Sequence, residues 1–188
     1  IKTPPDVVVN ILDASNLERS LYLTSQLLDM RVPMVVALNQ TDIADDHGLT
    51  VDHQHLSRHL GCPVVPAVAS RRVGVEELKA AVARVAVARA RPAARVSFGD
   101  AEHAVQRLQM CLIVAADDAA VDSRWLAIKL LEQDPFARDL TGNLFDEIVA
   151  EETARIARHS SHTPAEAIMD ARLGFIRGLA RDVVKRDL

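Results

Sequence analysis

The sequence predicts an α/β half-sheet with parallel strands, followed by a small all-α bundle. In the first half, short apolar runs rich in β-branched residues alternate with helical patterns, in the order strand, helix, three times over. Beyond residues 91–95 the strand pattern nearly vanishes and helical spacing dominates. We therefore expect two domains, 1–92 and 93–188. The chain is 49% hydrophobic but only 3% aromatic, so both cores must be built from Val, Leu, Ile and Ala.

The first strand is expected at residues 6–13, a β-branched run typical of a strand covered on both faces. Asn16 or Ser15 can cap the helix expected at 17–30, whose leucines mostly recur at helical spacing. The second strand is expected at 34–38, where every residue is apolar.

A short helix at 52–60 leads to a third strand at 64–68, and a helix rich in Ala and Val follows at 75–90. Parallel strands of this kind are joined by right-handed crossovers, and their ligands bind beyond the carboxyl ends of the strands. The residues expected at that rim are Asp13, Asn39, Ala69 and Ser70.

The second half is expected to hold one short strand at 96–98 and then only helices. Ser123 and Thr163 are the expected N-caps of two of them, and Trp125 is the expected packing anchor of the bundle. The helices are expected at 100–115, 123–132, 141–159 and 164–185. The expected core positions of the first of these helices are Leu108, Met110, Leu112 and Ile113.

The polar residues that end the second strand suggest recognition of a guanine base. Asn39 and Asp42 are three apart directly after that strand. The Asp carboxylate can accept hydrogen bonds from guanine N1–H and the exocyclic amino group, whereas adenine offers no such pair of donors. A buried carboxylate left unpaired by adenine would cost about 1–3 kcal/mol or more. The Asn side chain can tie neighbouring loops together.

The net charge, the cysteines and the lack of long apolar stretches argue against several classes of protein. A net charge of −4 and a pI near 6.0 give no general footprint for nucleic acid. Cys62 and Cys111 are expected to be reduced, buried thiols. No apolar stretch reaches the roughly 20 residues that span a bilayer, and residues 1–5 resemble no signal peptide. We expect the chain to be an interior piece of a longer protein.

Several blocks resemble one family. Residues 13–23 read D-A-S-N-L-E-R-S-L-Y-L, which is similar to D-A-[ST]-N-L-E-R-N-L-Y-L of the bacterial ferrous iron transport protein B family, FeoB. The resemblance continues through residues 33–42 and 60–66, and in the second half through 124–134 and 170–176. The blocks occur in both halves, in the order found in the family.

This resemblance implies that residues 1–92 are the C-terminal half of a Ras-like guanine-nucleotide-binding domain. Residues 93–188 would be a helical domain that resembles a nucleotide-dissociation inhibitor. The family's membrane region carries ferrous iron, so the implied partners are guanine nucleotide and the protein's own transmembrane region, at the cytoplasmic face of the bacterial inner membrane. GTP or GDP is the implied cofactor, with Mg²⁺ only in the intact parent protein. The implied guanine contacts are Asn39, Asp42, Ala69 and Ser70. Gln40 would cover the base face where Ras-like proteins usually have Lys.

The sequence contains no G-x-x-x-x-G-K-[ST] loop, whose backbone amides and Lys would hold the phosphates. We therefore expect this fragment not to hydrolyse GTP alone, because phosphoryl transfer depends on those positioning groups. Self-association through an unpaired edge of the first strand is also expected. Asp13 is expected to cap the following helix or to hold a loop. Arg71 and Arg72 are expected to be solvated or, near a nucleotide, to assist phosphates.

Two other functions remain open. One is a regulatory or interaction module that binds no nucleotide. The other is a metal-binding module, since His55 and His59 are four apart on one helix face. No cysteine is spaced to complete such a site, and a solvated polar face is the preferred interpretation. The histidines of this group are His47, His53, His55 and His59.

Overall fold

The computed structural model describes residues 5–115 and 121–186. Contacts divide the chain into two compact units: unit 1 holds Ile1–Arg95 and Phe175–Leu188, and unit 2 holds Val96–Gly174. The predicted domain boundary at residues 92 and 93 stays a prediction, because contacts do not measure independent folding. The end of the last helix belongs to unit 1, which the sequence pattern did not indicate.

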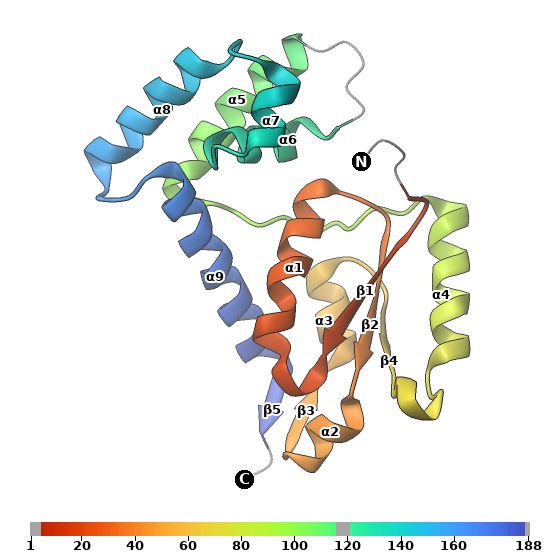
Figure 1. The fold of residues 1–188 in the computed structure, drawn as a ribbon. Coiled ribbons are helices and arrows are strands. Elements are labelled where there is room, and N and C mark those ends of the chain that lie inside the picture. Colours follow the sequence, from red (N-terminus) through yellow and green to blue (C-terminus); the bar gives the residue numbers. More distant parts are fainter. Residues whose placement is uncertain (1–4, 116–120, 187–188) are drawn as a thin grey trace. The chain divides into compact units, whose positions relative to one another are not determined.

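Unit 1 contains the predicted parallel sheet, in the order β1 (Val8–Asp13), β2 (Met34–Asn39), β4 (Val64–Pro66) (Figure 1). The register pairs Asp13 with Asn39 and Leu38 with Pro66. The carboxyl ends of all three strands therefore lie at one edge of the sheet, where the candidate residues follow them. The predicted fold class, an α/β sheet and then a helical bundle, is confirmed.

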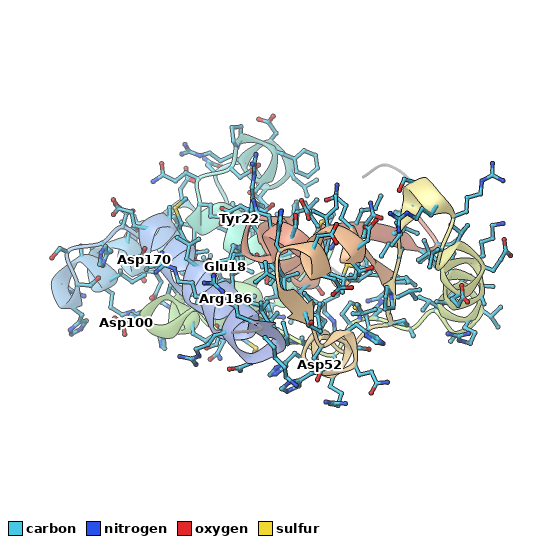
Figure 2. The ribbon with its side chains drawn as sticks, turned by 90° about the horizontal axis from the view of Figure 1, so that it is seen from below. Glu18, Tyr22, Asp52, Asp100, Asp170 and Arg186 are labelled. Carbon is cyan, nitrogen blue, oxygen red and sulfur yellow. The ribbon has the colours of Figure 1, made fainter. Side chains whose placement is uncertain are left out.

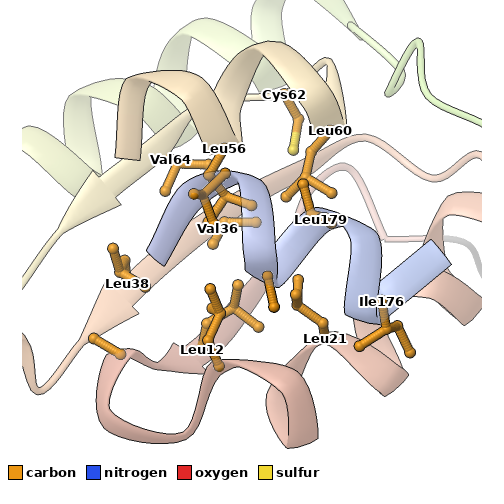
Figure 3. Close-up of a cluster of buried hydrophobic side chains, with 14 of the residues drawn as sticks. Leu12, Leu21, Val36, Leu38, Leu56, Leu60, Cys62, Val64, Ile176 and Leu179 are labelled. Atoms are coloured by element: carbon orange, nitrogen blue, oxygen red, sulfur yellow. The ribbon is translucent and has the colours of Figure 1, made fainter. Parts of the chain in front are cut away.

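Helices cover the two faces of this sheet unequally. One face packs against α1 (Leu17–Met30), α3 (His53–Leu60) and the last turns of α9 (Pro164–Val183), and the close-up in Figure 3 shows this cluster. The other face packs against α4 (Val75–Ala88), where Val35 meets Ala81 and Val85. The larger cluster includes Leu12, Leu21, Val36, Leu38, Leu56, Leu60, Ile176 and Leu179. Burial of each such side chain contributes about 1.5–3 kcal/mol.

Strand β1 was expected to be covered on both faces. Among the described residues only one of its faces is covered, so this expectation is wrong. Leu12 and Asn10 are buried, and the Asn10 amide donates to Thr24 Oγ1 of α1 at 2.7 Å. Val9 and Ile11 point the other way and are 41% and 67% exposed. Successive side chains of a strand point to opposite faces, which separates these two sets. The sequence did not indicate this alternation, because apolar β-branched residues occur at positions of both faces.

The free edge of β1 carries a prediction about association. In the described sheet β1 has one neighbour, β2, and exposed apolar side chains beside its unpaired edge. Such an edge recruits other strands, so we expect a polypeptide of these 188 residues to self-associate. Sedimentation equilibrium over a range of concentrations tests this, and an Ile11→Lys variant should shift the population towards monomer. A monomeric wild-type chain at the highest concentration would contradict the prediction.

Unit 1 also contains elements that the sequence pattern did not reveal. The turns η1 (Ala14–Asn16) and η2 (Ala69–Arg71) follow β1 and β4, and the short helix α2 (Thr41–Asp46) follows β2. A second sheet pairs β3 (Leu49–Val51) antiparallel with β5 (Val184–Arg186). Such short strands have too few residues for a periodic pattern, and their partners are distant in sequence.

Unit 2 is helical, as predicted, but two expected elements are wrong. No strand forms at residues 96–98, and the helix expected at 141–159 begins only at Asp146. A separate helix, Pro135–Thr141, lies before it, and Gly142, whose φ is 59°, follows the first of these two helices. Asp134 caps the first of them, with Pro135 at its start, a signal that the sequence did contain. Asp122, not Ser123, caps the helix before it. The elements are η3 (Gly99–Ala101), α5 (Glu102–Ala115), α6 (Ser123–Leu131), α7 (Pro135–Thr141), α8 (Asp146–His159) and the first part of α9.

A buried arginine, not the tryptophan, organises the core of unit 2. Arg124 is 6% exposed and donates to both carboxylate oxygens of Glu102, at 2.6 and 3.0 Å, and to the Val96 carbonyl at 2.9 Å. Phe98 lies against its guanidinium and gives its own amide to Glu102. Arg124 thus donates to the Val96 carbonyl, and Glu102 accepts from the Phe98 amide. In a strand, these two backbone groups would have been free to pair with a neighbouring strand.

The expected core of unit 2 therefore needs correction. Trp125 is only partly buried and makes an edge contact with Phe136 at 6.3 Å between ring centroids. Leu108 and Leu112 are buried as expected, but Met110 and Ile113 are 65% and 55% exposed. The buried face of α5 follows the spacing of four between Leu108 and Leu112, and Met110 and Ile113 fall outside it.

The ion pairs of unit 2 predict acid sensitivity. Burial alone raises the pKa of Glu102, but hydrogen bonds from Arg124 and from the Phe98 amide outweigh it, so the net pKa lies below the usual value. A lowered carboxyl pKa stabilises the fold at pH values above the unfolded pKa of about 4.3, and this contribution is lost as the pH falls through the folded pKa. We expect the melting temperature of unit 2 to fall steeply below about pH 4. A Glu102→Gln variant should have a lower melting temperature near neutral pH and a flatter acid dependence. Parallel melting curves for the two proteins across pH would contradict this.

Both cysteines are free thiols, as predicted. Cys62 is buried, and burial raises the pKa of its thiol to about 12, so it is unreactive near neutral pH. Cys111 is only partly buried, which corrects the expectation of two buried thiols. Among the described residues, no helix is both long and apolar enough to cross a bilayer.

Candidate functional site

Asn39 joins the two loops that follow β2 and β4. It is the last residue of β2, and its Oδ1 accepts a hydrogen bond from the Ala69 amide at 3.0 Å. The Ala67 amide also donates to the Leu38 carbonyl at 2.8 Å, which extends the pairing of the two strands. The structure thus brings together Asn39 and Ala69, which are 30 residues apart in the chain.

Asp42 lies in the first turn of α2, one turn beyond Asn39. Its side chain is 25% exposed, and Arg71 Nη2 of η2 lies 3.5 Å from its Oδ2. Arg71 is solvated, as expected, with 70% of its side chain exposed, and it also lies beside the Asp42 carboxylate. A role in assisting phosphates stays a prediction. At this distance and exposure the ion pair is weak, about 0–1 kcal/mol, so it does not prevent Asp42 from accepting other donors.

Gln40 connects the ends of β1 and β2. Its backbone is left-handed, with φ of 62°, and its side-chain nitrogen, in the amide orientation that satisfies both groups, lies 2.8 and 3.0 Å from the Asp13 carboxylate oxygens. Asp13 Oδ1 also accepts from the Ser15 amide and hydroxyl at 2.9 and 2.6 Å. Asp13 therefore caps the turn η1, which comes before the helix expected at 17–30, and it also contacts the loop after β2 through Gln40. The cover of a base face by Gln40 stays a prediction.

The loop after β4 is narrow and its tip is accessible. Val68 and Val73 form an isolated bridge, and between them Ala69 and Ser70 are exposed in η2. Gly74 ends the loop with φ of +80°, and a Cβ built there would lie 2.2 Å from the Pro66 carbonyl oxygen. Sequence reasoning missed Gly74, although a glycine just before a helical pattern is a signal for a special backbone conformation.

Gly74→Ala should destabilise the loop and, through it, the candidate site. Both the positive φ and the overlap with a backbone oxygen must be relieved, at a cost of about 2 kcal/mol or more. Chemical denaturation of the variant measures the loss. The matched control is Gly99→Ala, where φ is +52° but nothing lies within 4 Å of a built Cβ. An equal loss in both variants would show that the close approach at Gly74 has no consequence.

The arrangement offers donors and acceptors suited to a planar heterocycle. One carboxylate, Asp42, follows the central strand, and the adjacent loop, whose Ala69 amide is held by the side chain of Asn39, exposes Ala69 and Ser70. A carboxylate can accept from two neighbouring N–H groups of a heterocycle, and a backbone amide can donate to its carbonyl oxygen.

Comparison with known proteins finds matches in both halves of the chain. Residues 1–82 match the family described as "Ferrous iron transport protein B", and residues 98–185 match the "FeoB cytosolic helical domain". The chain belongs to the FeoB family. It corresponds to the family's G domain and cytosolic helical domain.

Curated FeoB relatives align with almost the whole chain. The Fe(2+) transporter FeoB of Escherichia coli (strain K12) is 36% identical over 188 residues, which cover 97% of this chain. The Shigella flexneri Fe(2+) transporter FeoB is 35% identical, also over 97% of this chain. In both cases the alignment covers 23% of the relative, so the chain spans about a quarter of the length of these FeoB proteins.

Solved FeoB structures share the fold. The cytosolic domain of L. pneumophila FeoB has a TM-score of 0.80 at 26% identity and covers 99% of this chain and 70% of that one. Mutants of S. thermophilus NFeoB were solved bound to GMPPNP and to GDP, with TM-scores of 0.82 and 0.79 and identities of 27% and 26%. They cover 92% and 94% of this chain, and each alignment spans 68% of the solved chain.

Proposed function

We propose that this chain is the guanine-nucleotide-binding and helical regulatory portion of a GTPase-coupled ferrous iron transporter, acting at the cytoplasmic face of the bacterial inner membrane. The FeoB relatives are named as Fe(2+) transporters, and solved relatives hold GDP and GMPPNP. The partners would be guanine nucleotide and the transporter's own membrane region.

One observation carries the proposal. The hydrogen bond from the Ala69 amide to Asn39 Oδ1 holds two loops together at the carboxyl ends of neighbouring parallel strands, the edge where such sheets bind ligands. In this arrangement Asp42 would accept from guanine N1–H and the exocyclic amino group. The backbone of Ala69 and Ser70 would face guanine O6, and the stem of Gln40 would cover one face of the base.

We assign recognition of the base, and not phosphate chemistry, to these residues. The 188 residues contain no phosphate-binding motif of the form G-x-x-x-x-G-K-[ST]. The carboxylate of Asp42 and the backbone of Ala69 and Ser70 suit guanine. We assign none of these residues to Mg²⁺. Hydrolysis of GTP is proposed for the intact transporter and not for this segment alone.

A competition experiment tests the proposal. The protein at its natural length is titrated with fluorescent GDP, and unlabelled GDP, GTP and ADP are used as competitors. We expect GDP and GTP to compete and ADP to fail by about 100-fold or more, since adenine leaves the Asp42 carboxylate unpaired. Equal competition by ADP, or no binding of labelled GDP, would refute guanine recognition. The latter result would favour the alternative of an interaction module that binds no nucleotide.

A further inference from the structure

We propose that His55, His59 and Asp182 form a binding site for a divalent first-row transition metal, separate from the guanine site. His55 and His59 are four apart on α3, and their Nε2 atoms face each other at 3.1 Å. Metal–nitrogen bonds of about 2.0–2.1 Å with ligand angles of about 90–109° place two nitrogens about 2.9–3.4 Å apart. The observed separation, which without a metal is an N–H···N hydrogen bond between the two rings, lies within the range that a chelated cation requires.

Asp182 supplies the third ligand from a different element. It lies in the last turns of α9, and its Oδ2 is 4.0 Å from His59 Nε2. Its other oxygen, Oδ1, lies 3.7 Å from Arg181 Nε, a weak contact between exposed groups. As the structure stands, no three such side chains of the described residues surround a common point, so a small rotation of the Asp182 side chain must complete the site.

The backbone around these ligands is held firmly, so only side-chain rotation is needed to form the site. Asp52, labelled in Figure 2 at the start of α3, caps that helix by accepting from the His55 amide at 2.8 Å. Its own amide donates to the Val183 carbonyl at 2.8 Å, next to Asp182. Leu56 and Val183 are fully buried in one core cluster. Ligands on packed helices lose little freedom on binding a metal.

The chemistry of the ligands selects the class of metal. Two imidazoles and one carboxylate suit Zn²⁺, Co²⁺ or Ni²⁺, whereas Ca²⁺ and Mg²⁺ prefer oxygen ligands alone. The ligand group is accessible, with side-chain exposures of 37% for His59 and 44% for Asp182, so the cation can enter and keep water as its other ligands. A bound cation would tie the end of α9 to α3 inside unit 1.

Calorimetry of the untagged 188-residue chain with Ni²⁺ tests the site. We expect one ion per chain, with binding that weakens as the pH falls from about 7.5 to about 5.5, because imidazole must be neutral to bind metal. His55→Gln and His59→Gln should each weaken binding at least about tenfold, because mutating residues that only support metal ligands already costs that much. Asp182→Asn should weaken binding about tenfold.

The matched control is His53→Gln, a histidine on the same helix for which no ion pair or side-chain hydrogen bond with the described residues is observed. It should bind Ni²⁺ as the wild type does. Circular dichroism of each variant checks that the fold is kept. The proposal is overturned if the wild type does not bind Ni²⁺, if the His55 and His59 variants bind as tightly as the His53 variant, or if Asp182→Asn has no effect.

Discussion

Asp42→Asn is expected to weaken GDP binding about 10- to 100-fold in the protein at its natural length. The substitution replaces a carboxylate that accepts from two guanine donors by an amide that offers a donor at one of those positions. Loss of such a paired contact costs about 1–3 kcal/mol, and each 1.4 kcal/mol is a factor of ten in affinity. Xanthine carries a carbonyl where guanine has its amino group, so XDP should bind the variant better than it binds the wild type.

Fluorescence titration with labelled GDP and XDP measures both affinities. The matched control is Asp45→Asn, which removes an exposed acid from the same short helix, α2, without touching the candidate site. Unchanged GDP affinity in the Asp42 variant would remove Asp42 from the base site. A loss of GDP binding without any gain for XDP would show that the residue supports the loop and does not read the base.

Arg124→Ala is expected to be among the most destabilising single changes in unit 2, by about 3–5 kcal/mol. The arginine is buried with Glu102, so its removal leaves a carboxylate with reduced solvation and the Val96 carbonyl without its donor. Breaking a buried ion pair from one side costs that much. The partly buried Trp125 is expected to matter less, in contrast to its predicted role as the anchor.

Urea denaturation followed by fluorescence of the single tryptophan, Trp125, measures the change in unfolding free energy. Arg138→Ala is the control, because Arg138 forms an exposed pair with Asp146 at 3.4 Å, worth about 0–1 kcal/mol. Similar losses in the two variants would mean that burial of Arg124 gives it no special role. Arg124→Met, which keeps much of the volume, should recover part of the loss.

Local patterns along the chain determined most of the secondary structure and the position of the candidate site. The helix expected at 17–30 is α1 itself, and the apolar run before Asn39 is the fully buried strand β2. Parallel strands align their carboxyl ends, so the order of elements was enough to predict that Asn39 and Ala69 would meet. The FeoB resemblance rested on the same residues.

Only the tertiary structure decided which distant segments pack together. The last turns of α9 close the core of unit 1, and β5 pairs with β3, although nothing local to residues 175–186 indicates those partners. The burial of Arg124 likewise depends on where Glu102 and the Val96 carbonyl lie. Periodicity reports the apolar face of a single helix. The partner of a buried charge, or of a histidine pair such as His55 and His59, is set by long-range packing, because the free energy of those contacts exists only once both segments are in place.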